Sequence, residues 1–449
     1  MKHLLLTALL SGMSGVSLWA QSINMPIIQT KYTADPAPYV HGDTVYLYTT
    51  HDEDYSEGFM MKDWLLYTST DMVNWQDHGV VASLKDFPWY KGDNGAWAEC
   101  VVERNGKWYM YCPIHGHGIG VLVSDSPYGP FKDPLGHPLV WRQEHWYDID
   151  PSVYIDDDGQ AYMYWGNPYT YCVKLKEDMI SIDGDIMTMD RIDDYQEGPW
   201  LWARKNDKGE KWYYLAFAST CCPEGIGYAM SKSPTGPWKH MGHIMDHTPR
   251  TRGNHPGIID YKGKSYCFGL TYDLFRLESS RHAERRSVSA AEMTYNADGT
   301  IKELPYFQDC KLEQNPYRRV EAETMAWGYG LKTTRENPSG PWNETLFVTD
   351  IDDGEYILVR GIDFGKKGAL KFHASCSSQL YGGRMEIRLD AVDGSLAGAI
   401  DIPNTKFKYR EFITDVTQCN GVRDVYFVFK STSIQKKNLF NFDWWKFDK

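Results

Sequence analysis

The sequence lacks two features that would tie the protein to nucleic acid or to a membrane. Its 47 Lys and Arg stand against 60 Asp and Glu, which gives a formal net charge of −13. A protein that binds phosphate groups or an anionic membrane surface needs a basic face, so this balance argues against both partners. Beyond residues 1–20, no run approaches the ~18 consecutive apolar residues of a transmembrane helix. We therefore expect no nucleic-acid partner and no membrane span.

Cysteines are few, and their spacing indicates no metal or redox motif. There are nine, an odd number, and no repeated CxxC pair occurs. Cys221 and Cys222 are adjacent, and we do not expect them to bridge each other. We predict that most of the thiols lie reduced in the core as small hydrophobic side chains. The cysteines thus indicate neither a zinc site nor a thiol nucleophile.

Residues 1–20 have the pattern of a secretory signal peptide. Lys2 and His3 form a short basic segment, residues 4–10 are nearly all apolar, and Ala20 is a small residue at the expected cleavage point. No cysteine lies nearby, so a lipoprotein anchor is not expected. The pattern predicts an exported protein, either periplasmic or secreted.

Aromatic residues are abundant. They make up 14% of the 449 residues, with 17 Trp and 31 Tyr, in a chain whose hydrophobic and charged fractions (42% and 24%) are those of an ordinary globular protein. The length suits two or three domains. Aromatic faces pack on sugar rings, so this acidic, aromatic-rich composition favours an uncharged carbohydrate ligand.

One strand pattern occurs five times. A Gly-containing turn precedes a short strand with alternating aromatic residues, which is typical of a half-buried antiparallel hairpin. The copies are HGDTVYLY (41–48), NGKWYMY (105–111), DDGQAYMYW (157–165), KGEKWYYL (208–215) and KGKSYCF (262–268). Repeats at roughly 45–65 residues, each with room for about four strands, predict a five-bladed β-propeller.

The pattern stops near Leu304, which sets the expected domain boundaries. We predict a propeller over 22–304, a linker over 305–317 and a second domain over 318–449. The last segment returns to short alternating strands, such as EYILVRGIDF and DVYFVFK, and its length suits one β-sandwich of jelly-roll type. The fold class is therefore all-β.

Acidic residues stand just ahead of three repeats, each directly before Pro or Gly-Pro: Asp35, Asp150 and Glu197. The innermost strands of a propeller converge on a central channel, so these three carboxyl groups should meet there. Crowded carboxylates repel, which pushes their pKa values apart and leaves one proton donor beside ionised partners. This combination is the equipment of a glycoside hydrolase.

From about Ile27 to Leu304 the sequence resembles glycoside hydrolase family 43, particularly its arabinoxylan arabinofuranohydrolase group. The stretches that carry the resemblance are ADPAPYV, HDED, MKDWLLYTSTDMVNWQDHG, VSDSPYGPFKDPLGHPLV, DIDPSVYIDDDGQAYMYWGNP, EGPWLW, NHPGIIDYKGKSY and RSVSAAEMTYNADGT. The resemblance implies a five-bladed, inverting enzyme. By position, Asp35 would be the general base, Asp150 the pKa-tuning aspartate and Glu197 the general acid.

The resemblance also implies roles for residues around the acids. His255 is similar to the family's axial histidine, which holds a central calcium largely through waters, although a histidine bonded to the protein alone would fit too. Asn254 and Arg286 match positions that hydrogen-bond the sugar. Trp97 is either a pocket wall or ordinary core, and His115 and His117 are expected at the pocket rim.

Residues 318–449 resemble carbohydrate-binding module family 6, through RVEAETMA, DIDDGEYILVRGIDFG and FNFDWWKF. Glu321, Glu323 and Asp443 match the family's structural calcium site, and their oxygen ligands suit Ca²⁺. A sugar cleft is less clear in the sequence. Asn441 and Phe407 are candidates, but Thr349 and Asp350 stand where an aromatic residue is often found.

The leading hypothesis is an exo-acting α-L-arabinofuranosidase that removes arabinose side chains from arabinoxylan, monomeric and without an organic cofactor. A β-xylosidase on the same scaffold is the main alternative, and a catalytically silent glycan-binding protein is another. A retaining fructosidase is rejected: Glu99-Cys100 imitates its EC pair, but Ile149 replaces the Arg of its RDP motif.

Overall fold

The protein is all-β, as predicted. The computed structural model describes residues 26–142, 147–247, 254–307, 315–335 and 346–449, so the predicted signal peptide lies outside the described residues. Within these ranges the only α-helix is the short α1 (Asp273–Glu278), and a 3-10 turn covers Leu84–Asp86. No helix in the described part of the chain is long and apolar enough to cross a bilayer.

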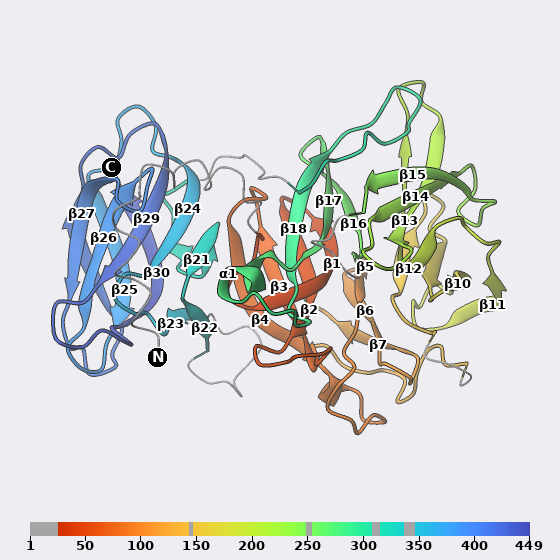
Figure 1. The fold of residues 1–449 in the computed structure, drawn as a ribbon, viewed down its shortest axis with the longest axis horizontal. Helices are drawn as coiled ribbons and strands as arrows, with labels where there is room; N and C mark the ends of the chain where they lie inside the picture. The colour runs from red at the N-terminus through yellow and green to blue at the C-terminus, as the bar shows by residue number, and fades with distance from the viewer. Residues whose placement is uncertain (1–25, 143–146, 248–253, 308–314, 336–345) are drawn as a thin grey trace.

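Five antiparallel sheets follow one another along residues 32–293 (Figure 1). The first contains β1 (Tyr32–His41), β2 (Thr44–Asp52), β3 (Asp63–Ser69) and β4 (Trp75–Ser83); the second β5 (Cys100–Arg104), β6 (Lys107–Pro113) and β7 (Ile119–Ser124); the third β8 (Ser152–Ile155), β9 (Ala161–Trp165), β10 (Tyr171–Leu175) and β11 (Ile182–Thr188); the fourth β12 (Tyr195–Lys205), β13 (Lys211–Ser219), β14 (Ile226–Ser231) and β15 (Lys239–Met245); the fifth β16 (Gly257–Tyr261), β17 (Lys264–Thr271) and β18 (Ser287–Met293).

Each repeated sequence segment falls on the hairpin between the first and second strands of one sheet. The turn glycine has a positive φ in every copy: Gly42 (+61°), Gly106 (+78°), Gly159 (+84°), Gly209 (+78°) and Gly263 (+77°). Only glycine adopts this conformation without steric cost, which explains why the turn residue recurs. The aromatic residues that follow pack between neighbouring sheets. Examples are Tyr48, Tyr111 and Tyr214, which are fully buried.

The first strands of the five sheets contact one another in a closed circle. β1 contacts both β5 and β16, while β8 contacts β5 and β12, and β12 contacts β16. The chain ends of the circle are joined because the Ile27 and Thr33 amides donate to the carbonyls of Val288 and Arg286, beside β18. The N-terminal ends of the first strands therefore surround one common centre.

The C-terminal part is a sandwich of two sheets, seen in blue in Figure 1. One sheet contains β22 (Lys332–Thr334), β23 (Phe347–Thr349), β30 (Asn441–Asp448), β25 (Lys371–Ser377) and β28 (Arg410–Asp415), with β19 (Val320–Glu321) paired to β30; the other contains β21 (Trp327–Tyr329), β24 (Tyr356–Asp363), β29 (Val422–Lys430), β26 (Gly383–Leu389) and β27 (Ser395–Ile402). Aromatic side chains of β29 and β30 fill the core between them.

The sandwich is joined to the first sheet of the ring. The short strand β20 (Thr324–Met325) pairs with β4 and extends that sheet to five strands. Beside it, the buried Asp77 of β4 pairs with Lys31 (Nζ to Oδ2, 2.9 Å) and accepts a hydrogen bond from Thr333 of the sandwich (2.6 Å). A shared strand ladder and the hydrogen bonds of Thr333 with this ion pair thus connect the two parts.

The cysteines confirm one prediction and correct another. Six of them are free and buried: Cys100, Cys112, Cys172, Cys267, Cys376 and Cys419. Cys221 and Cys222, however, form a disulfide, so the expectation that they do not bridge is wrong. The peptide bond between them is cis.

Candidate active site

Asp35 lies on β1 at a break in the ladder with β2. The register shifts between Ala34 and Ala37, and Asp35 has a φ of +52°, a conformation in which aspartate is one of the few non-glycine residues found. Bulges of this kind re-aim a side chain out of the regular pleat. The Asp35 carboxylate accepts hydrogen bonds from the Thr50 hydroxyl (2.8 Å) and from Arg286 (3.0 Å).

Asp150 occupies the equivalent place ahead of β8. It has a φ of +57°, precedes Pro151 and is buried, as Asp35 is. Burial raises the pKa of the Asp150 carboxyl group, and the nearby carboxylates of Glu197 and Asp35 raise it further, against the opposing effect of His255. Oδ2 of Asp150 has no hydrogen-bond partner. The Asp150 carboxyl group is therefore electrostatically coupled to the other two acids.

Glu197 lies near the start of β12, between two register shifts in the ladder with β13. It is the most exposed of the three acids, with 19% of its side chain accessible. One carboxylate oxygen accepts a hydrogen bond from the Asn167 amide, and the other lies 3.2 Å from Nε2 of His255. Exposure at the rim and a fixed orientation are both required of a group that hands a proton to a leaving oxygen.

His255 is the centre of the cluster. Its Nδ1 lies 3.4 Å from Asp35, and its Nε2 lies 3.8 Å from Asp150 and 3.2 Å from Glu197. Burial lowers the pKa of the imidazole, but the three carboxylates outweigh burial and raise it. A Cβ at position 198 would come within 3.0 Å of the His255 ring, so Gly198 is what lets the imidazole approach the strand of Glu197.

Beside His255 lies a cavity of about 20 Å³, lined from all five first strands. Its walls include Asp35, Glu99, Asp150, Gly198, His255 and the prolines that follow four of these positions. Glu99 is buried, neither of its carboxyl oxygens has a partner, and burial raises its pKa well above the usual value. Orphaned carboxyl oxygens are donors that Ca²⁺ accepts, so the residues here fit the central cation that the sequence predicts.

Arg286 is bound to acids rather than open to the pocket. It is 4% exposed, and its guanidinium donates to both oxygens of Asp52 (3.0 and 2.8 Å) as well as to Asp35. The carboxylates of Asp35 and Asp52 raise its pKa against the effect of burial. Its position makes it a counter-charge beside Asp35, and the sugar contact that the family resemblance implies stays a prediction.

The other two predicted pocket residues, Trp97 and Asn254, differ in how far they are exposed. Trp97 is partly exposed, stacks on His115 (ring centroids 3.9 Å apart) and lies 6.5 Å from the Phe59 ring. Phe59 in turn lies over the Arg286 guanidinium, at 5.1 Å, so Trp97 belongs to an aromatic wall next to Asp35. Asn254 is fully buried, and its Oδ1 accepts the Leu270 amide.

Sequence reasoning assigned no role to Phe59, Asp52 or Asn167. Asp52 and Asn167 occur within the family stretches HDED and DIDPSVYIDDDGQAYMYWGNP, which by themselves indicate no partner for either residue. Their roles depend on which acid or cation they face, and that partner lies far away in the sequence. No local signal in a single sequence identifies such a pair.

In the sandwich, Glu323 is the residue that best fits a cation. Its two carboxyl oxygens are buried without partners; burial raises its pKa well above the usual value, and Glu321, Asp77 and Asp443 add to the rise. Arg319 pairs with Glu321 through two contacts of 2.8 Å and lies 3.8 Å from Asp443. The three predicted ligands thus share one neighbourhood, with Arg319 as the competing cation.

The two candidate sugar-binding residues of the sandwich differ in exposure. Phe407 is 62% exposed, whereas Asn441 is partly buried and accepts a hydrogen bond from Thr349 (3.0 Å). Thr349 and Asn441 therefore lie together on neighbouring strands.

Comparison with known proteins agrees with both parts of the chain. The family model for glycosyl hydrolases family 43 matches residues 23–301, and that for carbohydrate binding module (family 6) matches residues 321–449. The chain is 33% identical to an arabinoxylan arabinofuranohydrolase of Bacillus subtilis (strain 168), over 99% of this chain and 98% of that protein. It is 31% identical to a xylosidase/arabinosidase of Bacteroides ovatus, over 61% of this chain and 95% of that protein.

Solved structures give the same result. The crystal structure of a glycoside hydrolase family 43 arabinoxylan arabinofuranohydrolase from Bacillus subtilis, in complex with cellotetraose, matches with a TM-score of 0.82 at 31% identity and covers 95% of this chain and 97% of that one. The ring of sheets is accordingly a β-propeller, and the sandwich is the binding module. The chain belongs to glycosyl hydrolases family 43 and is a glycoside hydrolase with a C-terminal family 6 carbohydrate binding module.

Proposed function

We propose that the protein is an exo-acting α-L-arabinofuranosidase that removes arabinose side chains from arabinoxylan. The observation that carries the chemistry is the cluster of three carboxyl groups around His255 at the centre of the propeller. The similarity to an arabinoxylan arabinofuranohydrolase along nearly the whole chain supports the substrate. A site at the centre of a ring of strands admits one terminal sugar, so the enzyme acts on branches.

The proposed mechanism is a single displacement. Asp35 deprotonates a water that attacks the anomeric carbon, and Glu197 protonates the departing oxygen of the xylan chain. Arg286 and Thr50 hold Asp35 in place through the hydrogen bonds described above. Asn167 does the same for Glu197.

An inverting mechanism needs the base and the acid to stand roughly 6.5–9.5 Å apart, which leaves room for the water. Asp35 and Glu197 contact opposite nitrogens of the His255 ring, Nδ1 and Nε2, so the imidazole separates them. Burial and the carboxylates of Glu197 and Asp35 raise the pKa of Asp150, so the three acids exchange protons as one coupled group with Glu197 as its donor to the leaving oxygen.

Further features complete the proposal. The five sheets are taken as five blades, with the propeller over 22–304, the linker over 305–317 and the module over 318–449. Ca²⁺ would be held in the central cavity by Glu99 and His255, and in the module by Glu321, Glu323 and Asp443. A bound ion would neutralise part of the crowded negative charge there. Export follows from the pattern of residues 1–20, and the enzyme acts as a monomer.

A β-xylosidase activity is the second candidate. The similarity to a xylosidase/arabinosidase over 61% of the chain supports it, because both terminal sugars present similar hydroxyl groups to one pocket.

Proton NMR of a fresh digest of wheat arabinoxylan tests substrate and mechanism together. We expect release of arabinose that first carries the inverted β configuration. Release of xylose or xylo-oligosaccharides without arabinose contradicts the substrate, and an initial α-anomer contradicts single displacement. An Asp35→Asn sample under the same conditions controls for contaminating activity.

A further inference from the structure

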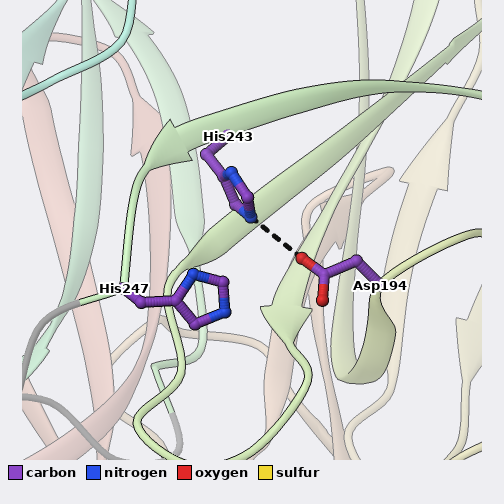
Figure 2. Close-up of side chains that lie close together, drawn as sticks. All are labelled: Asp194, His243 and His247. Carbon is purple, nitrogen blue, oxygen red and sulfur yellow. Dashed lines mark hydrogen bonds and ion pairs between the residues drawn. The ribbon is translucent and has the colours of Figure 1, made fainter.

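A second cluster of ligating side chains lies at the edge of the fourth sheet where β12 begins and β15 ends, and it shares no residue with the three acids. Asp194 directly precedes β12, His243 lies on β15, and His247 follows the end of that strand. One ligand atom from each of the three lies within 4.8 Å of the others. Figure 2 shows His243 joined to Asp194 and the His247 ring turned toward the same space.

Hydrogen bonds already orient both imidazoles. Oδ1 of Asp246 lies 2.9 Å from Nδ1 of His247 and 3.8 Å from Nδ1 of His243, so one carboxylate faces the same nitrogen of both rings. The two Nε2 atoms point the other way: that of His243 lies 2.9 Å from Asp194, and that of His247 lies 3.1 Å from the Ser219 hydroxyl. A carboxylate on one ring nitrogen, with the other nitrogen left to face a metal, is the arrangement that surrounds histidine metal ligands.

The donor set decides which ion would bind. Two imidazole nitrogens and one carboxylate oxygen suit Zn²⁺ and similar transition metals, whereas Ca²⁺ and Mg²⁺ prefer oxygen ligands. Tetrahedral ligands at about 2.0–2.2 Å from an ion lie about 3.4 Å apart, so ligand atoms that lie within 4.8 Å of one another need to close by at most about 1.4 Å. The side chains of Asp194, His243 and His247 are 23%, 24% and 37% accessible, which leaves a path for the ion to enter.

We propose that Asp194, His243 and His247 bind a divalent transition metal of the Zn²⁺ class, with Asp246 orienting the imidazole of His247. The Ser219 hydroxyl or a water occupies the fourth position. Asp194 stands three residues ahead of Glu197, and in an antiparallel sheet the start of β12 and the ends of β13 and β15 share one edge. The ion would tie that edge together and stabilise the segment from which Glu197 projects, without taking part in the reaction.

Calorimetric titration of the full chain tests this. The protein is stripped with chelator, exchanged into buffer with excess Ca²⁺, and titrated with ZnCl₂ at pH 7.5. We expect one site that Ca²⁺ does not block, lost in His247→Gln and in Asp194→Asn. Asp246→Asn should weaken the affinity about 10- to 100-fold, as loss of an orienting carboxylate does. His137→Gln, which changes an exposed histidine elsewhere in the propeller, is the matched control and should bind as the wild type does.

Two results overturn the proposal: no Zn²⁺ site in the wild type, or undiminished binding in both His247→Gln and Asp194→Asn. Co²⁺ provides a second readout, because a four-coordinate site with nitrogen ligands gives visible absorption bands that His247→Gln should remove. The melting temperature of each metal-free variant checks that it folds. Arabinose release by metal-free protein is measured separately, so failure of the metal site and failure of the proposed arabinofuranosidase activity remain distinguishable.

Discussion

The substitution Glu197→Gln tests the role of Glu197 as proton donor and leaves the other two acids of the cluster unchanged. Glutamine keeps the shape of the side chain but has no acidic proton to give to the leaving oxygen. We expect kcat on arabinoxylan to fall about 10²- to 10⁴-fold, the usual contribution of general acid catalysis. At 1.36 kcal/mol per factor of ten, this raises the barrier by about 3–5 kcal/mol.

The contacts of Glu197 indicate that the variant folds. Asn167 can still donate to the glutamine oxygen, so one of the two hydrogen bonds survives. The contact with Nε2 of His255 (3.2 Å) loses its charge, which costs about 1.5–3 kcal/mol of stability when a charged hydrogen bond is removed. Because 19% of the side chain is accessible, water compensates part of this.

The assay compares two leaving groups. The dinitrophenolate of a dinitrophenyl arabinofuranoside leaves without needing a proton. The kcat of Glu197→Gln should therefore fall less than about tenfold on this substrate and far more on arabinoxylan. Glu292→Gln, a surface acid paired with Lys264, is the control and should behave as the wild type on both. Equal losses on the two substrates, or near wild-type turnover on arabinoxylan, would refute the assignment of Glu197.

Three further outcomes are expected. Asp35→Asn should lower kcat about 10²-fold or more with both leaving groups, because the water must be activated whatever departs; a loss confined to arabinoxylan would contradict a general base. Asp77→Ala should destabilise the protein in urea by about 3 kcal/mol at neutral pH, since it breaks the buried pair with Lys31 and the bond to Thr333. Burial raises the pKa of Asp77, but these partners lower it overall. The difference in unfolding free energy between the wild type and Asp77→Ala should therefore shrink as the pH falls below about 4. A difference that stays constant with pH would exclude the ion pair. Glu323 has its pKa raised by burial, so in chelator the wild type should lose stability as the pH rises above about 4.5, and Glu323→Gln should melt higher than the wild type at pH 8. Added Ca²⁺ should raise the melting temperature of the wild type only; equal melting of both proteins with and without Ca²⁺ would rule out the site.

Local physical rules made much of this protein predictable from its sequence. A turn glycine followed by alternating aromatic residues is typical of a hairpin, so the five repeats could be located at 41–48, 105–111, 157–165, 208–215 and 262–268. In the structure the turn glycine of each repeat has a positive φ. The position of Asp35, Asp150 and Glu197 ahead of these hairpins, each before Pro or Gly-Pro, indicated which acids would meet. The family resemblance added their roles, which remain predictions.

What only the tertiary structure decided are the contacts between residues far apart in the chain. The contact of Arg286 with Asp35 depends on how the fifth sheet closes against the first, 251 residues away in the sequence. The strand β20, which docks the module on β4, and the meeting of Asp194 with His243 and His247 depend on ring and sheet geometry in the same way. Sequence periodicity describes neighbours along one strand, whereas these partners are chosen by packing between sheets. The sequence therefore determines the hairpins and the candidate acids, whereas the partner of each buried charge is determined by the closed fold.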